Sequence, residues 1–205
     1  MLSAIILAAG RSSRMGGAPK ALMTIGKETF LERIVGELQG CGIDEMLIVL
    51  GARSEEILRQ EETWQRIPVG ASNIPIKILV NDEWETGQLS SLRTGIRNLS
   101  AESEGVLFTL VDHPLTGSAA YKAVIDAWRQ DRKKIVVPTF RGRRGHPTVF
   151  PRRLYRKVLD LDLPNGARDI LRLESDSVVL VPVDDPGIVT DIDTPEDYRK
   201  ILIKE

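Results

Sequence analysis

Residues 5–20 read IILAAGRSSRMGGAPK, an apolar run that ends in small residues and opens into a loop. The loop combines three glycines with three cations: Gly10, Gly16, Gly17, Arg11, Arg14 and Lys20. Small residues let backbone amides approach a polyphosphate, and cations neutralise its charge. Because the loop follows a predicted buried strand, we expect it at the carboxyl edge of a parallel sheet, where α/β proteins bind ligands. The stretch therefore predicts a phosphate-binding loop.

The loop does not match the two best-known phosphate motifs. A Walker A loop that begins at Gly10 needs glycine at position 15, then lysine and a hydroxyl residue, but the chain has Met15, Gly16 and Gly17. The dinucleotide fingerprint needs a second glycine where Ser12 stands. The sequence therefore disfavours a P-loop NTPase and a nicotinamide-dependent dehydrogenase.

Around this loop, apolar runs rich in Val, Ile and Leu alternate with amphipathic stretches of helical length. The alternation predicts one α/β domain over residues 1–205 with a mostly parallel sheet. Expected strands cover residues 3–7, 46–50, 76–80, 106–110, 135–138 and 178–183, with a short extended piece at 148–150. Expected helices cover residues 29–39, 54–65, 89–99, 118–129, 152–159, 167–173 and 194–203, and residues 66–75 are expected to form a loop. Capping boxes are expected at Thr29 with Glu32 and at Thr194 with Asp197.

The composition is that of a globular protein that works in a reducing compartment. The chain has 205 residues, of which 42% are hydrophobic and 28% charged, enough for one good core. A formal net charge of −1 argues against nucleic acid as a partner. The apolar start at residues 2–9 is too short to span a membrane. The single Cys41 cannot form an internal disulfide and no secretory leader is recognised, so we expect a cytoplasmic protein.

Carboxylates follow two later segments. Residues 106–114 read VLFTLVDHP, a buried-strand pattern that ends in Asp112. An acidic residue after a strand is often only a helix cap, but near a phosphate loop it suits Mg²⁺, which takes oxygen ligands. Asp191 and Asp193 lie two residues apart, so an extended chain would place them on one face. Asp193 or Thr194 is expected to cap the last helix, which leaves the other position free to complete a metal site.

The first loop resembles the signature L-A-A-G-x-x-S-x-R-M-G-x-x-K of the MobA-like nucleotidyltransferases, with Lys20 displaced by the inserted Ala18 and Pro19. Within that group the chain looks most like the molybdenum cofactor cytidylyltransferase (MocA-like) branch. The resemblance implies a three-layer α/β/α, Rossmann-like fold with a mixed, mostly parallel sheet. It also implies Mg²⁺ at Asp112, where the family commonly has D-Q-P, and at the motif D-I-D-T-P-E-D-Y. There Asp191 is expected nearer the metal, with Asp193 as a capping or outer partner.

Three further segments carry the resemblance. NDEWETGQLSSL at 81–92 resembles the family's N-x-x-W-x-x-G-x-x-S-S-L, which helps form the nucleoside pocket, and Trp84 is expected to be a packing residue. GRRGHPTVF at 142–150 resembles G-x-x-G-H-P-V-x-F, which is associated with the acceptor side. NGARDIL at 165–171 resembles G-D-x-G-A-R-x-L-L, although the usual acidic residue is replaced by Pro164 and Asn165, which leaves the acceptor's identity open.

The resemblance implies transfer of a nucleoside monophosphate from an NTP to a phosphorylated acceptor, with release of pyrophosphate. The residues expected to bind the nucleotide are Leu7, Ala8, Ala9, Gly10, Arg11, Lys20, Asn81, Gly87, Ser90 and Ser91. Those expected to hold the acceptor are His113, Gly145, His146 and Arg168, with Arg143 and Arg144 beside them. The expected catalytic residues are Arg14 on the leaving pyrophosphate, Lys20 between the triphosphate and the acceptor, and Asp112 on magnesium.

The resemblance favours CTP as the nucleotide and molybdopterin as the acceptor, with a molybdoenzyme as the client that receives the product. GTP and ATP remain open alternatives. Two other functions are also open: transfer to a sugar phosphate or another small phosphorylated acceptor, and non-catalytic binding of a nucleotide or molybdopterin by a chaperone. Because the chain keeps Arg14, Lys20, Asp112 and Asp191 together, a pure binding protein is disfavoured.

Overall fold

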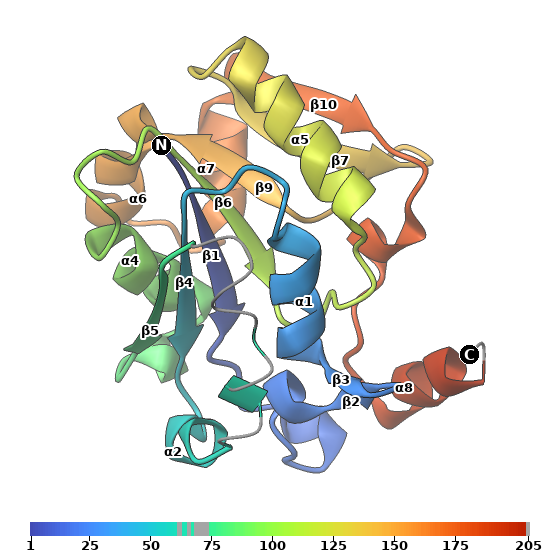
Figure 1. Cartoon of the computed structure of the whole chain (residues 1–205). Helices are drawn as coiled ribbons and strands as arrows, with labels where there is room; N and C mark the ends of the chain where they lie inside the picture. Colours follow the sequence, from blue (N-terminus) through green and yellow to red (C-terminus); the bar gives the residue numbers. More distant parts are fainter. Residues whose placement is uncertain (61–62, 65–66, 68–73, 204–205) are drawn as a thin grey trace.

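The computed structural model of the chain describes residues 1–60, 63–64, 67 and 74–203. Its middle layer is an eight-stranded sheet with the order β10-β7-β9-β6-β1-β4-β5, and β8 pairs with β7 (Figure 1). The strands are β1 Leu2–Ala8, β4 Glu45–Leu50, β5 Ile76–Val80, β6 Gly105–Leu110, β7 Ile135–Phe140, β8 Arg143–Arg144, β9 Thr148–Pro151 and β10 Val178–Pro182. A separate hairpin joins β2 Thr24–Ile25 to β3 Glu28–Thr29.

Most neighbouring strands run parallel, and β9 is the exception inside the sheet. Strand β1 pairs in parallel with β4 and β6, β4 with β5, and β7 with β10. Strand β9 lies antiparallel between β6 and β7. The predicted fold class is therefore confirmed, and the piece expected at 148–150 is a full member of the sheet.

Helices cover both faces of the sheet, because alternate side chains of the buried strands point to opposite sides. The helices are α1 Phe30–Leu38, α2 Ser54–Leu58, α4 Gln88–Arg97, α5 Ser118–Gln130, α6 Tyr155–Asp160, α7 Ala167–Leu173 and α8 Pro195–Leu202. The even-numbered residues of β1, such as Ala4 and Ile6, pack in one core cluster with α1 and α5. The odd-numbered Ile5 and Leu7 pack in a second cluster with α4, α6 and α7. The result is a three-layer α/β/α arrangement.

The expected helices agree with the structure except at some boundaries. Both capping boxes are present, at Thr29 with Glu32 and at Thr194 with Asp197. The helix expected over 54–65 is shorter, because α2 ends at Leu58. Residues 61, 62 and 65 of that expectation, and 66 and 68–73 of the expected loop, lie outside the described residues. The start of the helix expected at 152 is a 3₁₀ turn, Arg152–Leu154, which continues into α6.

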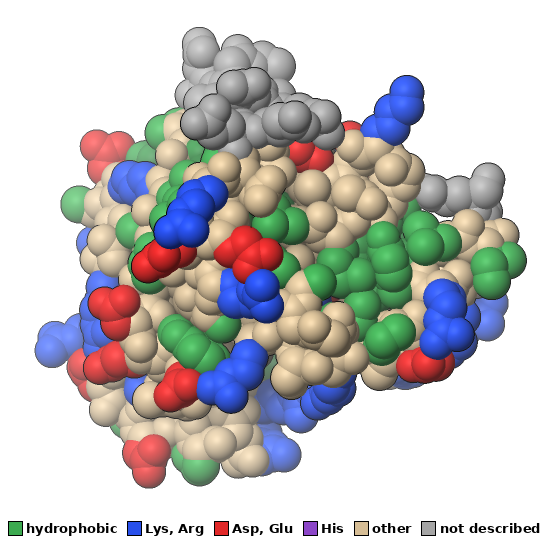
Figure 2. All heavy atoms as spheres, turned by 90° about the horizontal axis from the view of Figure 1, so that it is seen from below, with side chains coloured by type: hydrophobic (Ala, Val, Ile, Leu, Met, Phe, Trp, Pro, Cys, Tyr) green, Lys and Arg blue, Asp and Glu red, His purple; other side chains and the backbone are tan. Residues whose placement is uncertain are grey.

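The parallel strands all end at one edge of the sheet, and Figure 2 looks onto that face. Basic and acidic side chains lie next to one another across its centre (Figure 2). Within the described residues, no helix is both long and apolar enough to cross a membrane.

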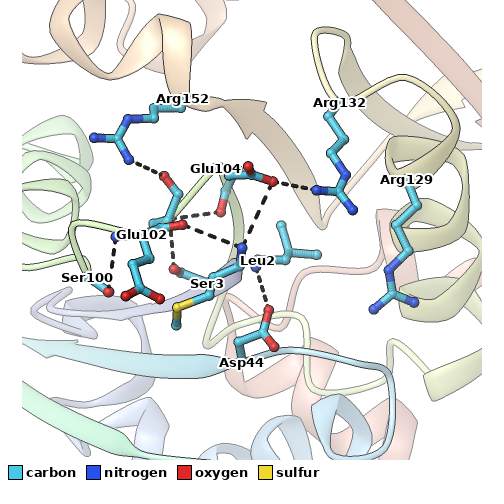
Figure 3. Close-up of polar contacts among 12 residues, drawn as sticks. Leu2, Ser3, Asp44, Ser100, Glu102, Glu104, Arg129, Arg132 and Arg152 are labelled. Carbon is cyan, nitrogen blue, oxygen red and sulfur yellow. Dashed lines mark hydrogen bonds and ion pairs between the residues drawn. The ribbon is translucent and has the colours of Figure 1, made fainter.

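The opposite edge is held by contacts within the chain. Figure 3 shows Leu2 beside Asp44, whose Oδ2 accepts a hydrogen bond of 2.7 Å from the Leu2 amide. Nearby, the buried carboxylate of Glu45 accepts from Ser3 Oγ at 2.7 Å and from the Ser100 amide at 2.8 Å. Such hydrogen bonds, together with Lys77 Nζ at 3.2 Å from Oε2, compensate the buried charge of Glu45. These contacts fix β1 relative to β4 and so fix where the loop after β1 begins.

Candidate active site

A cavity of about 590 Å³ opens at the carboxyl edge of the sheet, around the loop that follows β1. Its lining includes eleven of the predicted site residues: Leu7, Ala8, Ala9, Gly10, Arg11, Arg14, Lys20, Gly87, Ser91, Asp112 and Asp193. They come from the β1 loop, the start of α4, the end of β6 and the segment before α8. The fold therefore brings together residues that are far apart in the sequence.

The loop after β1 folds back on itself through left-handed backbone conformations. Gly16 and Gly17 have φ of 71° and 86°, values that favour glycine, and Ser12 shares this region at 53°. The amides of Met15 and Gly17 donate to the carbonyl of Ser12. A Cβ built on Gly10 would meet no atom within 4 Å, so this backbone faces open space in the cavity. The loop leaves room for a ligand close to its main chain.

Asp112 is held at the end of β6 by backbone hydrogen bonds on both sides. The Val111 amide donates to Leu7 of β1 at 3.1 Å, and the Ile192 amide donates to the Asp112 carbonyl at 2.8 Å. The side-chain Oδ1 is buried and has no hydrogen-bond partner among the described residues, and His113 Nε2 lies 3.8 Å from it. A buried polar atom without a partner is unusual in a native protein, and a bound ion or water is one way to satisfy it.

Lys20 links Asp112 to Asp193. Its Nζ lies 3.4 Å from Oδ2 of Asp112 and makes a close ion pair with Oδ1 of Asp193. Arg14 pairs with the other oxygen of Asp193 at 2.7 Å. The hydrogen bond from Lys20, with the nearby charges of Lys20 and Arg14, lowers the pKa of Asp193 below its ordinary value. The two carboxylates are therefore neutralised by the two cations that the sequence predicted for phosphate.

Asp191 and Asp193 lie in the segment just before α8. Thr194 caps α8, so Asp193 does not act as the cap. Asp193 lines the cavity that contains Lys20, whereas the exposed Asp191 lines a second, adjoining cavity, and the expectation that Asp191 lies nearer the metal stays a prediction. Asp112 lines both cavities. Asp193 is thus the carboxylate joined to Asp112 through Lys20.

Asn81 has a different position from the one expected for a nucleoside contact. It is buried at 4% exposure and lines neither cavity. Its Nδ2 donates to the hydroxyl groups of Ser90 and Ser91 at 2.8 and 3.0 Å, and its Oδ1 accepts from the Glu83 amide. Asn81 therefore supports the turn into α4 from behind, and of the other predicted nucleoside contacts in this motif Gly87 and Ser91 line the first cavity.

Trp84 contributes to the site more directly than its expected packing role. It lines the first cavity, and the Arg11 guanidinium lies 5.0 Å from the centre of its ring. Arg11 also pairs with Glu85 at 2.5 Å. A cation over an aromatic face is attracted by the ring quadrupole. The contact joins the loop after β1 to the loop after β5 at the wall of the cavity. In the sequence, the motif around Trp84 was the one signal that pointed to this region.

The second cavity, of about 940 Å³, lies next to the first and contains the predicted acceptor residues. Five arginines line it: Arg93, Arg97, Arg143, Arg144 and Arg168. Arg93 and Arg97 were not expected here, because α4 reads as an ordinary amphipathic helix with exposed charges. Arg93 donates to the carbonyls of Val158 and Leu161, so it also ties α4 to α6. The arginines can bind anionic groups of a ligand, and four acidic residues line the same cavity: Glu83, Asp112, Asp162 and Asp191.

His113 and His146 lie against each other at the wall of the second cavity, with ring centres 5.3 Å apart. Burial of the His146 ring and the neighbouring His113 lower the pKa of His146 to about 3. The Nδ1 of His146 is buried and has no hydrogen-bond partner among the described residues. His146 is therefore neutral near neutral pH and presents an unpaired ring nitrogen.

The low pKa of His146 predicts a specific loss of stability in acid. Between its unfolded pKa and about 3, the unfolded chain binds a proton at this position and the folded chain does not, so stability falls as the pH falls. From about pH 7 to about pH 5 this group should cost up to about 2 kcal/mol of unfolding free energy. Urea unfolding of the wild type and His146→Gln at both pH values measures it. An equal loss in the two proteins would contradict the assignment.

The chain matches one protein-family model and several curated proteins. Residues 4–179 match the family model of the MobA-like NTP transferase domain. The chain is 28% identical to nicotine blue oxidoreductase of Paenarthrobacter nicotinovorans, over 98% of this chain and 96% of that protein. It is 26% identical to a molybdenum cofactor guanylyltransferase of Haemophilus influenzae, over 98% of both chains. It is 24% identical to the molybdenum cofactor cytidylyltransferase of Escherichia coli, over 96% and 93% of the two chains.

The fold also matches solved structures. The crystal structure of Rv0371c from Mycobacterium tuberculosis superposes with a TM-score of 0.80 and 23% sequence identity, over 98% of this chain and 97% of that one. At this identity the match supports the fold, and the site rests on the residues described above.

Proposed function

The chain belongs to the MobA-like NTP transferase family, and from this premise we propose that it transfers a nucleoside monophosphate from an NTP to a small phosphorylated acceptor. We propose CTP as the nucleotide and molybdopterin as the acceptor, with Mg²⁺ as the cofactor. The product would pass to a molybdoenzyme in the cytoplasm. The proposal rests on one observation above all. Asp112 lines both the first and the second cavity, so a group bound at Asp112 can contact a ligand in each.

The first cavity, around the loop after β1, has the features of a triphosphate site. Gly10 leaves its backbone open to the cavity, and Arg14 and Lys20 supply positive charge. Gly87 and Ser91 at the start of α4 line the same cavity. The free backbone amides at a helix N-terminus attract anions such as phosphates. Trp84 and Arg11 close one side of it. A nucleotide bound here would keep its phosphates near Lys20 and Asp112.

The carboxylates suit magnesium. Mg²⁺ is usually held by one or two carboxylates together with substrate phosphates and water. Asp112 offers a buried oxygen without a hydrogen-bond partner, and Asp193 lies across Lys20 from it. No cluster of three or more His, Cys or acidic side chains able to hold a metal occurs in the described part of the chain, which fits a site completed by the nucleotide. When bound, the ion would neutralise charge on the phosphoryl oxygens.

The chemistry then needs positioning more than acid–base groups. An oxygen of the acceptor phosphate attacks the α-phosphorus, a P–O bond forms, and the bond to pyrophosphate breaks. In the proposed arrangement Lys20 bridges the triphosphate and the acceptor phosphate, and Arg14 neutralises the leaving pyrophosphate. Arg143, Arg144 and Arg168 hold the anionic acceptor in the second cavity. The neutral His146 offers its unpaired nitrogen to a polar group of that acceptor.

Gly10→Ala should weaken nucleotide binding without unfolding the protein. The added methyl meets no protein atom within 4 Å, so we expect stability to change by less than about 0.5 kcal/mol. It does occupy the space where phosphates would approach the backbone, and we expect the Kd for the NTP to rise about tenfold or more. Isothermal titration with CTP and thermal unfolding measure the two effects. Unchanged nucleotide affinity would place the triphosphate elsewhere.

Pyrophosphate release tests the proposed function. Purified protein is incubated with Mg²⁺ and CTP, GTP or ATP separately, with and without molybdopterin. Release that needs both one nucleotide and the acceptor supports the proposal and identifies the base. Pyrophosphate release with sugar phosphates but not with molybdopterin would identify a sugar phosphate as the acceptor in place of molybdopterin. Failure to bind or turn over any NTP, above all with binding of a nicotinamide dinucleotide instead, would overturn the transferase function.

A further inference from the structure

The ammonium group of Lys20 lies where a cation between Asp112 and Asp193 would lie. The Lys20 side chain is only 11% exposed, and its Nζ contacts one oxygen of each carboxylate. The direction of the side chain is set locally, because the Lys20 amide donates to Ser12 Oγ at 3.2 Å and Pro19 precedes it. Lys20 is therefore a built-in partner for both carboxylates rather than a mobile surface lysine.

The charges of this group balance without any added ion. Asp112 and Asp193 carry two negative charges, and Lys20 and Arg14, which pair with them, carry two positive charges. A divalent cation that approached Asp112 and Asp193 would meet the Lys20 ammonium at close range. Like charges at that distance repel strongly when they are shielded from water. The buried Oδ1 of Asp112 is the one carboxylate oxygen in this group that Lys20 and Arg14 leave without a partner.

We infer that Lys20 acts as a placeholder cation that suppresses metal binding until a nucleotide arrives. The inference rests on the proposed function, in which the same residues take Mg²⁺ and a triphosphate. The phosphates offer new anionic partners to Lys20 and Arg14, so both can leave Asp193. Asp112 and Asp193 are then free to bind the metal that accompanies the phosphates. Metal and nucleotide binding are thereby coupled, and each raises the affinity for the other.

Binding of Mn²⁺ alone, without nucleotide or acceptor, tests the inference. Mn²⁺ is followed by the EPR signal of the free ion in wild type, Lys20→Met and Lys20→Arg. Lys20→Met removes the charge and keeps an unbranched side chain, so we expect it to bind Mn²⁺ about tenfold or more tightly. Lys20→Arg keeps the charge and should bind as weakly as the wild type. Lys122→Met, which removes an exposed lysine of α5, is the matched control and should also behave as the wild type.

A second readout guards against a folding defect in Lys20→Met. Without Lys20 the two carboxylates repel each other, so the variant should unfold at a lower temperature and gain more from Mn²⁺ than the wild type gains. Adding Asp112→Asn to Lys20→Met should abolish that gain. Equal or weaker Mn²⁺ binding by Lys20→Met, or an equal thermal gain, overturns the inference. Because the assay contains no nucleotide, its result is independent of the transfer assay. The wild type can release pyrophosphate while this inference fails, and Lys20→Met can gain affinity for Mn²⁺ in a protein that transfers no nucleotide.

Discussion

Asp112→Asn should lower the rate of nucleotidyl transfer about a thousandfold and leave the fold unchanged. The substitution keeps the size of the side chain, and the backbone contacts of Asp112 with Ile192 and of Val111 with Leu7 do not involve the carboxylate. It removes a negative oxygen that is buried and has no hydrogen-bond partner in the described structure, at the one acidic residue shared by both cavities. In the proposed reaction that oxygen would hold the metal ion against the reacting phosphate, so its removal should mainly lower kcat.

Steady-state pyrophosphate release measures this effect, and thermal unfolding verifies the fold. Asp126→Asn is the matched control, because Asp126 is an exposed carboxylate of α5 that pairs with Lys122. Asp193→Asn should reduce the rate less, about ten- to a hundredfold, because Asp112 remains. Asp191→Asn should act mainly on the KM of the acceptor, since Asp191 lines the second cavity. Near-normal turnover by Asp112→Asn would remove this residue from the reaction.

Gly145→Ala should destabilise the protein by about 2–3 kcal/mol and weaken acceptor binding. A Cβ at this position would lie 2.0 Å from the backbone oxygen of Ile188, which a rotamer change cannot relieve. The Gly145 amide donates to Pro138, and the next amide, of His146, donates to that same Ile188 oxygen at 2.9 Å. The methyl group therefore separates two backbone segments that carry His146 and Asp191 into the second cavity.

The two effects are measured by urea unfolding and by the acceptor dependence of pyrophosphate release. We expect the acceptor KM to rise about tenfold or more, whereas the Kd for the NTP stays unchanged, because Gly145 does not line the first cavity. Gly36→Ala is the matched control, since Gly36 lies in α1 with no atom within 4 Å of an added Cβ. That change should stabilise the protein by about 0.5–1 kcal/mol. A Gly145→Ala protein as stable as the wild type would contradict the close packing at Ile188.

Much of the fold follows from local signals in the sequence. Fully buried parallel strands read as continuous apolar runs, and two capping boxes mark where α1 and α8 begin. What local signals do not carry is the place of β9. Four residues, Thr148–Pro151, fill the gap between β6 and β7 through long-range pairing, and a short apolar run alone does not reveal its neighbours or its direction.

The site shows the same limit at the level of single residues. The glycine loop and Asp112 were predictable, since both follow buried strands that end at one edge. The difference between Asp191 and Asp193 was not, because the rule that residues two apart share a face applies to regular strands, and residues 191–193 are not in one. The position of Asn81 depends on hydrogen bonds to Ser90 and Ser91, which form only when the start of α4 lies against the residue that follows β5.

The two adjoining cavities suggest how such a chain can change its chemistry over evolution. Apart from Asp193, the first cavity is built from residues up to Asp112, whereas the second adds a block between Val137 and Leu171 and the turn at Ile188–Asp191. Substitutions in the later block can reshape one ligand site and leave the glycine loop untouched. If that block is exchanged between relatives, the hybrid protein should take the acceptor preference of the protein that supplied the block. It should keep the nucleotide preference of the protein that received it.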